Sequence, residues 1–359
     1  MKSAHLYTTG NDIEVRLKDV PVPKPLPSQV LIRVVAVGTN PKDWKYLLQF
    51  NGKQGETAGD DIAGFVEAVG SDVTEFKVGD RVGAFHEMTT PHGGFAEFAI
   101  AWENSTFHLR KETSFEEAAT IPLAAMTAAL ALFCYLRLPE PWVLPTRTER
   151  EELAGGVLVY GAASAVGAFA IKLLARANIH PIIAVAGRGI PYVESLVDIS
   201  KGDVIIDYRG GDDEVVKGLR IAVPPGNKLL YALDAVSEGS SYLNIVKALD
   251  PYGHITFVLP GDYKEVPSTV HKTITLVGAV HGNAIADSQH GHPDMLSDFG
   301  YAWFRLFSVG LKDGWFTGHP YEVVPGGLHG VETGLRNLRE GKASAVKYLC
   351  RIAETEGLS

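Results

Sequence analysis

The strongest chemical signal in the chain is a glycine-bounded turn between an apolar run and an amphipathic stretch. Within Gly155–Ala177 (GGVLVYGAASAVGAFAIKLLARA), Val157–Tyr160 predicts a buried strand and Gly161–Gly167 a turn. The apolar residues that follow recur at helical spacing. The first N–H groups of such a helix would face a pyrophosphate, so this order predicts a dinucleotide-binding turn. Ser164 replaces the middle glycine of the usual fingerprint, and an ordinary strand-to-helix turn is the alternative.

The residues after the next strand bear on which dinucleotide the turn would bind. An Asp or Glu about 20 residues past the glycines would bind the adenosine ribose and favour NAD. The predicted strand Pro181–Ala186 is followed instead by Gly187, Arg188 and Gly189. A guanidinium can hold a phosphate through two hydrogen bonds, so Arg188 favours the 2′-phosphate of NADPH. An arginine that only faces solvent is the alternative.

Composition narrows the class of protein. With 359 residues and 46% hydrophobic content, the chain can bury a large core and is expected to form two domains. A net charge of −9 without a basic tail argues against nucleic acid as a partner, and two cysteines are too few for a disulfide framework. The N-terminus lacks the apolar core of a signal peptide. Thr120, Pro122 and Thr127 interrupt the apolar stretch Ala118–Leu138, which favours a buried helix over a membrane span. We therefore expect a cytoplasmic monomer or homodimer.

The elements that must position this chemistry differ between the two parts of the chain. In residues 1–100, short apolar segments separated by glycine and proline predict a compact β-rich domain. From Phe115 to Tyr135 the pattern is helical, interrupted at Pro122, and Pro139–Glu152 is expected to be a long loop. Strands then alternate with helices, which implies a parallel sheet with right-handed crossovers. The predicted strands are Asp12–Asp19, Gln29–Val37, Phe65–Val69, Pro181–Ala186, Asp203–Ile206, Leu229–Leu233, His254–Leu259, Leu276–Val280 and Lys347–Ile352, and the later helices are Tyr192–Val197, Asp213–Leu219, Ser240–Leu249 and Val331–Gly341.

Several motifs together resemble the medium-chain dehydrogenase/reductase superfamily over nearly the full length of the chain. They are NPKDW at 40–44, AGDDIAGFVEAVG at 58–70, VGDRV at 78–82, GGFAEF at 93–98, IIDYR at 205–209, YALD at 231–234 and GKASAVKYLCRI at 341–352. The chain is most similar to fungal trans-acting enoyl reductases of polyketide biosynthesis, through residues 231–258 and 319–342. The resemblance implies an α/β protein with a GroES-like β-rich catalytic domain at 1–122 and 295–359. It also implies a Rossmann doubly wound parallel sheet domain at 123–294.

Zinc-dependent members of that superfamily carry ligands that this sequence lacks. They have a cysteine near Thr39 and Asn40 and a Gly-His-Glu near Gly59–Asp61, and neither is present here. Catalytic zinc needs three protein ligands. His290 and His292 form a close pair, but in a polar loop that favours a solvated role. The sequence therefore predicts a zinc-independent enzyme.

The resemblance also assigns the candidate site residues. It brings Asn40, Lys42, Asp43 and Trp44 to the nicotinamide end of the cofactor. Lys45 and Thr127 become the candidate catalytic side chains, with a surface lysine and a buried helix threonine as the respective alternatives. Further cofactor contacts are implied at Ala162, Ala163, Ser164, Ala165, Val166, Gly187, Arg188, Tyr208, Leu259, Pro260, Leu349 and Cys350, and substrate contacts at Gly278, Ala279, Val280, His281 and Gly282.

The function that these features predict is an NADPH-dependent enoyl reductase. Hydride would go to the β-carbon of an α,β-unsaturated, polyketide-type acyl thioester carried by a polyketide synthase. The developing enolate oxygen needs a donor, whether a backbone N–H, Thr127 or Lys45. Residues 278–282 and Phe304–Phe307 are expected to line an apolar channel with few fixed charges. The alternatives are a zinc-free quinone or enone reductase and a catalytically inactive NADPH-binding protein.

Overall fold

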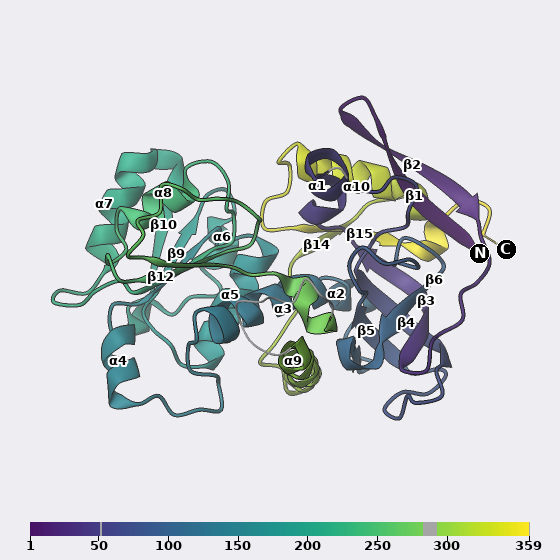
Figure 1. Ribbon diagram of the computed structural model, residues 1–359, viewed down its shortest axis with the longest axis horizontal. Coiled ribbons are helices and arrows are strands. Elements are labelled where there is room, and N and C mark those ends of the chain that lie inside the picture. The colour runs from purple at the N-terminus through teal and green to yellow at the C-terminus, as the bar shows by residue number, and fades with distance from the viewer. Residues whose placement is uncertain (51, 283–292, 359) are drawn as a thin grey trace. The chain divides into compact units, whose positions relative to one another are not determined.

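The computed structural model describes residues 1–50, 52–282 and 293–358, and the chain divides into two compact units (Figure 1). The first unit comprises Met1–Leu123 and Gly278–Ser359, and the second comprises Ala124–Val277. The sequence analysis placed the two crossings between the units at 122–123 and 294–295. In the structure the second crossing comes earlier, so Gly278–Gly282 belongs to the first unit.

Among the described residues of the first unit, the main sheet is mixed and takes strands from both ends of the chain. Its order is β14-β15-β3-β4-β5-β7, with β6 also paired to β3, and β1 and β2 form a separate hairpin. β15 runs antiparallel to β3, so residues about 310 positions apart share one ladder. The strands are β1 Lys2–Thr9, β2 Asp12–Asp19, β3 Gln29–Gly38, β4 Asp61–Val69, β5 Arg81–Phe85, β6 Phe98–Trp102, β7 Thr106–His108, β14 Tyr321–Val323 and β15 Lys347–Arg351.

Helices fill the ends and the edge of this sheet. α1 begins directly after β3, with Asn40 before its first residue and Pro41 at the first helical position, where proline is well tolerated. The helices are α1 Pro41–Gln49, α2 Phe115–Ala118, α9 Pro293–Asp313 and α10 Gly330–Arg339, with short 3-10 turns at Glu103–Ser105, Val277–His281, Gly327–His329 and Ile352–Glu354.

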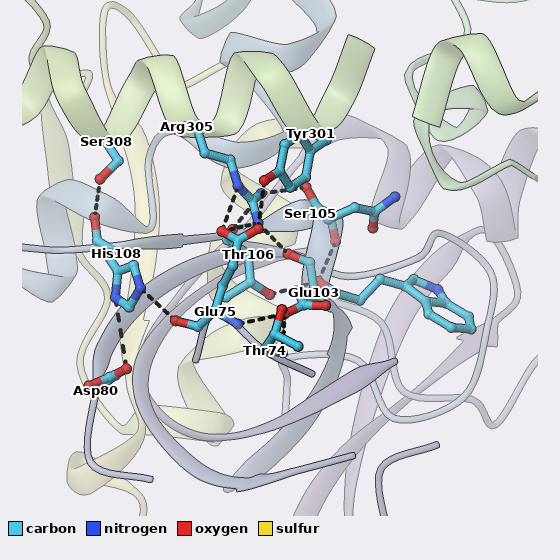
Figure 2. Close-up of polar contacts among 12 residues, drawn as sticks. Thr74, Glu75, Asp80, Glu103, Ser105, Thr106, His108, Tyr301, Arg305 and Ser308 are labelled. Carbon is cyan, nitrogen blue, oxygen red and sulfur yellow. Dashed lines mark hydrogen bonds and ion pairs between the residues drawn. The ribbon is translucent and has the colours of Figure 1, made fainter. Parts of the chain in front are cut away.

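Hydrogen bonds and an ion pair hold α9 against the edge of the sheet (Figure 2). The Arg305 guanidinium donates to Glu75 Oε2 at 2.8 Å and to the backbone carbonyls of residues 103, 104 and 106. The hydroxyl of Tyr301 donates to Glu75 Oε1 at 2.7 Å, and that of Ser308 donates to the backbone oxygen of His108 at 2.8 Å. Because these bonds occupy backbone acceptors in and before β7, they hold α9 against this edge of the sheet.

The second unit contains a parallel sheet with the order β10-β9-β8-β11-β12-β13. This is the doubly wound arrangement that the sequence predicted, and its strand order reverses between β8 and β11. The strands are short, and β8 and β9 are completely buried and lack charged residues, as expected for strands covered on both faces of a sheet. The strands are β8 Val157–Tyr160, β9 Ile182–Ala186, β10 Val204–Asp207, β11 Tyr231–Asp234, β12 His254–Phe257 and β13 His271–Ile274. The helices are α3 Pro122–Ala129, whose first two residues belong to the first unit, a π-helix at Leu130–Tyr135, α4 Arg147–Leu153, α5 Ala165–Arg176, α6 Ile190–Val193, α7 Asp212–Ala222 and α8 Ser241–Val246, with 3-10 turns at Ile199–Lys201 and Tyr208–Gly210.

Three local predictions were wrong. Leu276–Val280 is not a strand: the last parallel strand is β13, and residues 277–281 form a buried 3-10 turn. The expected loop at 139–152 contains the start of α4, which the sequence signals through a Thr146/Glu149 capping box. The helix expected at Tyr192–Val197 ends at Val193.

The apolar stretch Phe115–Tyr135 is long and apolar enough to cross a membrane by length and composition. In the structure 94% of its most apolar window is buried. It is also divided, because α2 ends at Ala118 and α3 begins only at Pro122. These features are those of core helices in a folded protein, as the sequence predicted.

Candidate active site

The dinucleotide turn of the second unit has the geometry that a bound pyrophosphate needs. Gly161 adopts a φ of +80°, which a side chain would strain. A Cβ on Gly167 would lie 2.3 Å from Gly161 O, so this position holds the helix close against the strand. Ser164 caps α5 by accepting a hydrogen bond from Gly167 N at 3.1 Å. The N–H groups of Ala165 and Val166 then stand at the helix start, where an anion would bind.

Two residues predicted to contact the adenosine phosphate follow neighbouring strands of the same sheet. β9 and β10 are neighbours, with Ala186 paired to Asp207, so their carboxyl ends lie side by side. Tyr208 packs its ring against Gly187, where a Cβ would lie 2.5 Å from the ring. Arg188 is exposed and Tyr208 half-exposed. β9 ends without a carboxylate, and the exposed Arg188 stands two residues past its end.

The remaining predicted cofactor residues differ in accessibility. Ala162 is buried at the end of β8, whereas residues 163–166 are half-buried. Leu259 and Pro260 lie just beyond the end of β12, where Leu259 O accepts a hydrogen bond from Tyr263 at 2.7 Å. In the first unit, the side chains of Leu349 and Cys350 are completely buried in β15. Their backbone is buried as well, because β15 pairs with β3 at both positions.

The first unit contains a buried polar network where three of its strands meet α1. Lys347 Nζ binds the Asp61 carboxylate and donates to Asn40 Oδ1 at 2.8 Å. Asn40 Nδ2 donates to Asp61 Oδ2 at 2.7 Å, and Leu123 N donates to Asp61 Oδ1 at 2.6 Å. A Cβ on Gly38 would lie 2.8 Å from Lys347 Cε, so glycine leaves room for the lysine stem. The network joins β15, α1, β4 and the start of α3 at one point.

Lys42 lies next to this network, between two further carboxylates. Its ammonium group lies 3.2 Å from Asp43 Oδ1 and forms an ion pair with Asp60 Oδ2. Both carboxylates are almost wholly buried. Burial raises the pKa of Asp43 to about 6, against the lowering effect of Lys42, and raises the pKa of Asp60 as well. Burial lowers the pKa of Lys42, but the two carboxylates together outweigh burial and raise it, which keeps the ammonium charged.

A small pocket of the first unit adjoins these charges. Its lining includes Lys42, Asp43, Tyr46, Thr57, Asp60, His86 and Thr90. His86 is buried, with Nδ1 2.7 Å from Ile100 O and Nε2 3.2 Å from Thr90 O. Burial lowers its pKa. Leu6 and Leu47 also line it, so the pocket combines charged and apolar side chains, and it contains none of the residues of the predicted apolar channel.

The segment predicted to contact substrate lies beside Phe85 in the same unit. The His281 ring is tilted against the Phe85 ring, with the centroids 4.7 Å apart, and its Nε2 lies 3.2 Å from Phe85 O. Burial lowers the pKa of His281 to about 4, so the imidazole is neutral near pH 7. Ala279 and Val280 are buried, and Gly278 lies opposite Met88. Within this segment, Gly278 and His281 are partly exposed and Gly282 is exposed.

The two candidate catalytic side chains are both buried. Lys45 is 3% exposed on α1, with Nζ 5.0 Å from the Trp44 ring, so the surface-lysine alternative was wrong. Thr127 is 4% exposed on α3. The expectation that Phe304 and Phe307 line a channel was also wrong. Both are fully buried and pack among Phe107 and Phe316, as core residues do.

Among residues 1–50, 52–282 and 293–358, no group of three or more His, Cys, Asp or Glu side chains could hold a metal ion. His290 and His292, the close pair in the sequence, lie outside the described residues. At the positions of the zinc ligands in the resembled enzymes, Asp60 and Asp61 each engage a lysine ammonium instead.

Comparison with known proteins now identifies the family. Residues 26–111 match the alcohol dehydrogenase GroES-like domain. The chain is 41% identical over 318 residues to the trans-enoyl reductase fsr4 of Gibberella fujikuroi, covering 88% of this chain and 89% of that protein. The chain belongs to the trans-enoyl reductase family.

Solved structures agree with this placement in fold. The CurK enoyl reductase has a TM-score of 0.73 at 22% identity, covering 97% of this chain and 98% of that one. A mycobacterial protein solved as a complex with NADPH has a TM-score of 0.72 at 20% identity, covering 97% and 99%. The predicted medium-chain dehydrogenase/reductase architecture is thereby confirmed.

For this family member, sequence reasoning missed the polar partners in the first unit. It selected Asn40, Lys42 and Asp43, but not Asp60, Asp61 or Lys347, which complete their contacts. One signal was available, since Asp60 precedes and Asp61 opens strand β4, and the five residues that follow, 62–66, are all apolar. Carboxylates in such a position need buried cationic partners.

Proposed function

We propose that the protein is an NADPH-dependent enoyl reductase that saturates the α,β double bond of a polyketide-type acyl thioester. The observation that carries the proposal is 41% identity to a trans-enoyl reductase over almost the whole of both chains. We further propose that the thioester is presented by a carrier-protein domain of a polyketide synthase, that the enzyme is cytoplasmic, and that it works without zinc.

The proposed cofactor fits the residues of the second unit. Gly167 lets the start of α5 lie close against the turn after β8, and that start offers N–H groups to a pyrophosphate. Arg188 and Tyr208 would hold the 2′-phosphate of NADPH, because β9 ends without an acidic residue. The structural relative that was solved with NADPH supports the same choice.

The chemistry requires one hydride, one proton and a donor for the developing oxyanion. Bound NADPH would supply the hydride to the β-carbon. Lys45 and Thr127 are the proposed donors to the thioester oxygen, where negative charge develops in the transition state. Residues 278–282 would form part of the acyl-chain wall, with the neutral imidazole of His281 at its accessible end.

The direct test supplies deuterium-labelled NADPH with a 2-enoyl thioester of N-acetylcysteamine and follows the product by mass spectrometry. We expect NADPH oxidation, a product heavier by one hydrogen pair, and deuterium at the β-carbon with the carbonyl retained. Matched reactions use NADH, a simple quinone and a small enone. Quinone turnover far above that of every thioester, or deuterium on a carbinol carbon, would refute the proposal. Binding of NADPH with no turnover on any acceptor would favour an inactive binding protein.

A further inference from the structure

The pocket of the first unit contains a group of three charges that the oxyanion chemistry does not use. Lys42, on the first turn of α1, contacts the carboxylates of both Asp43 and Asp60. The side chains of the two carboxylates are 0% and 1% exposed, whereas that of Lys42 is 23% exposed. The ammonium group is therefore the accessible end of the cluster, and the carboxylates lie behind it.

The charges of this cluster do not balance when all three groups are ionised. Asp61 has its own cation in Lys347, but Asp43 and Asp60 share Lys42. Two carboxylates with one ammonium leave a net charge of −1 in a buried place, where an unbalanced charge is costly. Uptake of one proton removes that charge, and the raised pKa of Asp43, about 6, lies where such a proton is exchanged near neutral pH.

The other titratable groups around the cluster leave this proton in place. His86 contacts the carbonyls of Ile100 and Thr90, and its lowered pKa keeps it neutral. Lys347 and Asp61 neutralise each other on the side of β15 and β4. At the rim of the pocket, Lys53 pairs with Glu56.

We propose that Lys42, Asp43 and Asp60 form a proton relay that protonates the α-carbon after hydride transfer. Lys42 Nζ–H gives its proton to the α-carbon of the enolate, so that a C–H bond forms and an N–H bond breaks. The neutral amine then takes the proton of the carboxylic acid behind it, which restores the ammonium and leaves two carboxylates. Water reloads one carboxyl for the next cycle. The relay rests on the proposed enoyl reduction, which supplies the enolate.

The sharpest test uses variants that separate charge from acidity. Lys42→Arg keeps the positive charge, but a guanidinium does not give up its proton in proteins. Lys42→Met removes both the positive charge and the acidic proton. Lys77, an exposed lysine of the same unit, is replaced by Arg and by Met as the matched controls. The substrate is a 2-methyl-2-enoyl thioester in D2O, and the readouts are kcat, KM and the configuration of the deuterium at the α-carbon.

We expect the wild type and both Lys77 variants to give one α-epimer. Both Lys42 variants should lose roughly 10²- to 10⁴-fold in kcat, the usual contribution of a general acid, and give a mixture of epimers. A Lys42→Arg enzyme with the wild-type rate and one epimer would show that only the charge matters, and would overturn the relay.

A second measurement tests the stored proton without any turnover. Carbon-13 NMR of protein labelled at aspartate carboxyls should show one carboxyl that titrates near pH 6. Asp60→Asn should lower that pKa by removing the neighbouring negative charge. If no aspartate titrates near pH 6, the relay is wrong even where the enzyme reduces enoyl thioesters. If the carboxyl titrates but no thioester is reduced, the proposed function is wrong, and the relay to an α-carbon is wrong with it.

Discussion

Replacing Lys347 by Met should destabilise the first unit strongly. Lys347 is 4% exposed and contacts the Asp61 carboxylate, which is completely buried, and Asn40 Oδ1. Methionine has a similar length and keeps the apolar stem. The substitution therefore removes the ammonium group from the network without creating a large cavity.

The expected magnitude follows from the burial of the partner. After the substitution, Asp61 retains the N–H donors of Asn40 and Leu123 but no cation. Removing one member of a buried ion pair costs about 3–5 kcal/mol, because an uncompensated charge is left in the interior. An exposed pair costs much less, about 0–1 kcal/mol. Lys342→Met is the matched control, since Lys342 pairs with Glu340 with both side chains more than half exposed.

Urea denaturation followed by tryptophan fluorescence measures the effect. Most of the signal comes from the first unit, which contains Trp44, Trp102, Trp303 and Trp315, whereas the second contains only Trp142. The loss of about 3–5 kcal/mol should lower the midpoint by roughly 1–3 M urea, or leave the unit unfolded without denaturant. The control should keep its midpoint near that of the wild type.

A double variant separates the ion pair from the position. Asp61→Leu combined with Lys347→Met replaces the pair by apolar groups, so it should be less destabilised than Lys347→Met alone. The reasoning is refuted if Lys347→Met unfolds with the wild-type midpoint. It is equally refuted if the double variant loses the sum of the two single effects, because the two groups would then not interact.

Three further outcomes can be measured. Arg188→Ala should weaken NADPH roughly 10- to 150-fold, the value of lost charge-assisted hydrogen bonds, and leave NADH nearly unchanged in binding titrations; equal losses would exclude a phosphate contact. Gly167→Ala should abolish cofactor binding and lower the melting temperature, because its Cβ would lie 2.3 Å from Gly161 O, whereas Gly210→Ala, with its nearest contact at 3.5 Å, should do neither. His281 has a lowered folded-state pKa of about 4, so the unfolded chain binds more protons below pH 6.5 and stability should fall as the pH drops from there toward 4. His281→Gln should flatten that part of the stability profile, and an unchanged slope would contradict the burial argument.

The sequence by itself determined the features that depend on residues close together in the chain. The strand, the turn and the helix around Gly161 follow from a local change of apolar period and two glycines. The lack of an acidic residue after β9, where Arg188 stands instead, is likewise a feature of residues close together in the chain. Alternating strands and helices fixed the parallel sheet, because right-handed crossovers leave few other topologies.

The local sequence pattern did not predict secondary structure correctly where a segment is apolar only because it is buried. The run at residues 276–280 is as apolar as a strand, yet it forms a 3-10 turn after β13. Apolar character reports exclusion from water and does not distinguish a strand from a buried turn of the same length. The helix α4 shows the converse, since its capping box was readable but a polar, proline-rich neighbourhood suggested a loop.

Only the tertiary structure decided which charged residues are partners. Lys347 meets Asn40 and Asp61, about 300 residues away, because β15 pairs with β3, and β3 with β4. Lys42 contacts Asp43 and Asp60 because α1 follows β3, and the end of β3 pairs with the start of β4. The energy of an ion pair depends on the distance between the two charges and on their burial. Both depend on which strands become neighbours. Spacing along the chain carries no such information, so the same lysines were compatible with a solvated surface until the sheet brought carboxylates to them.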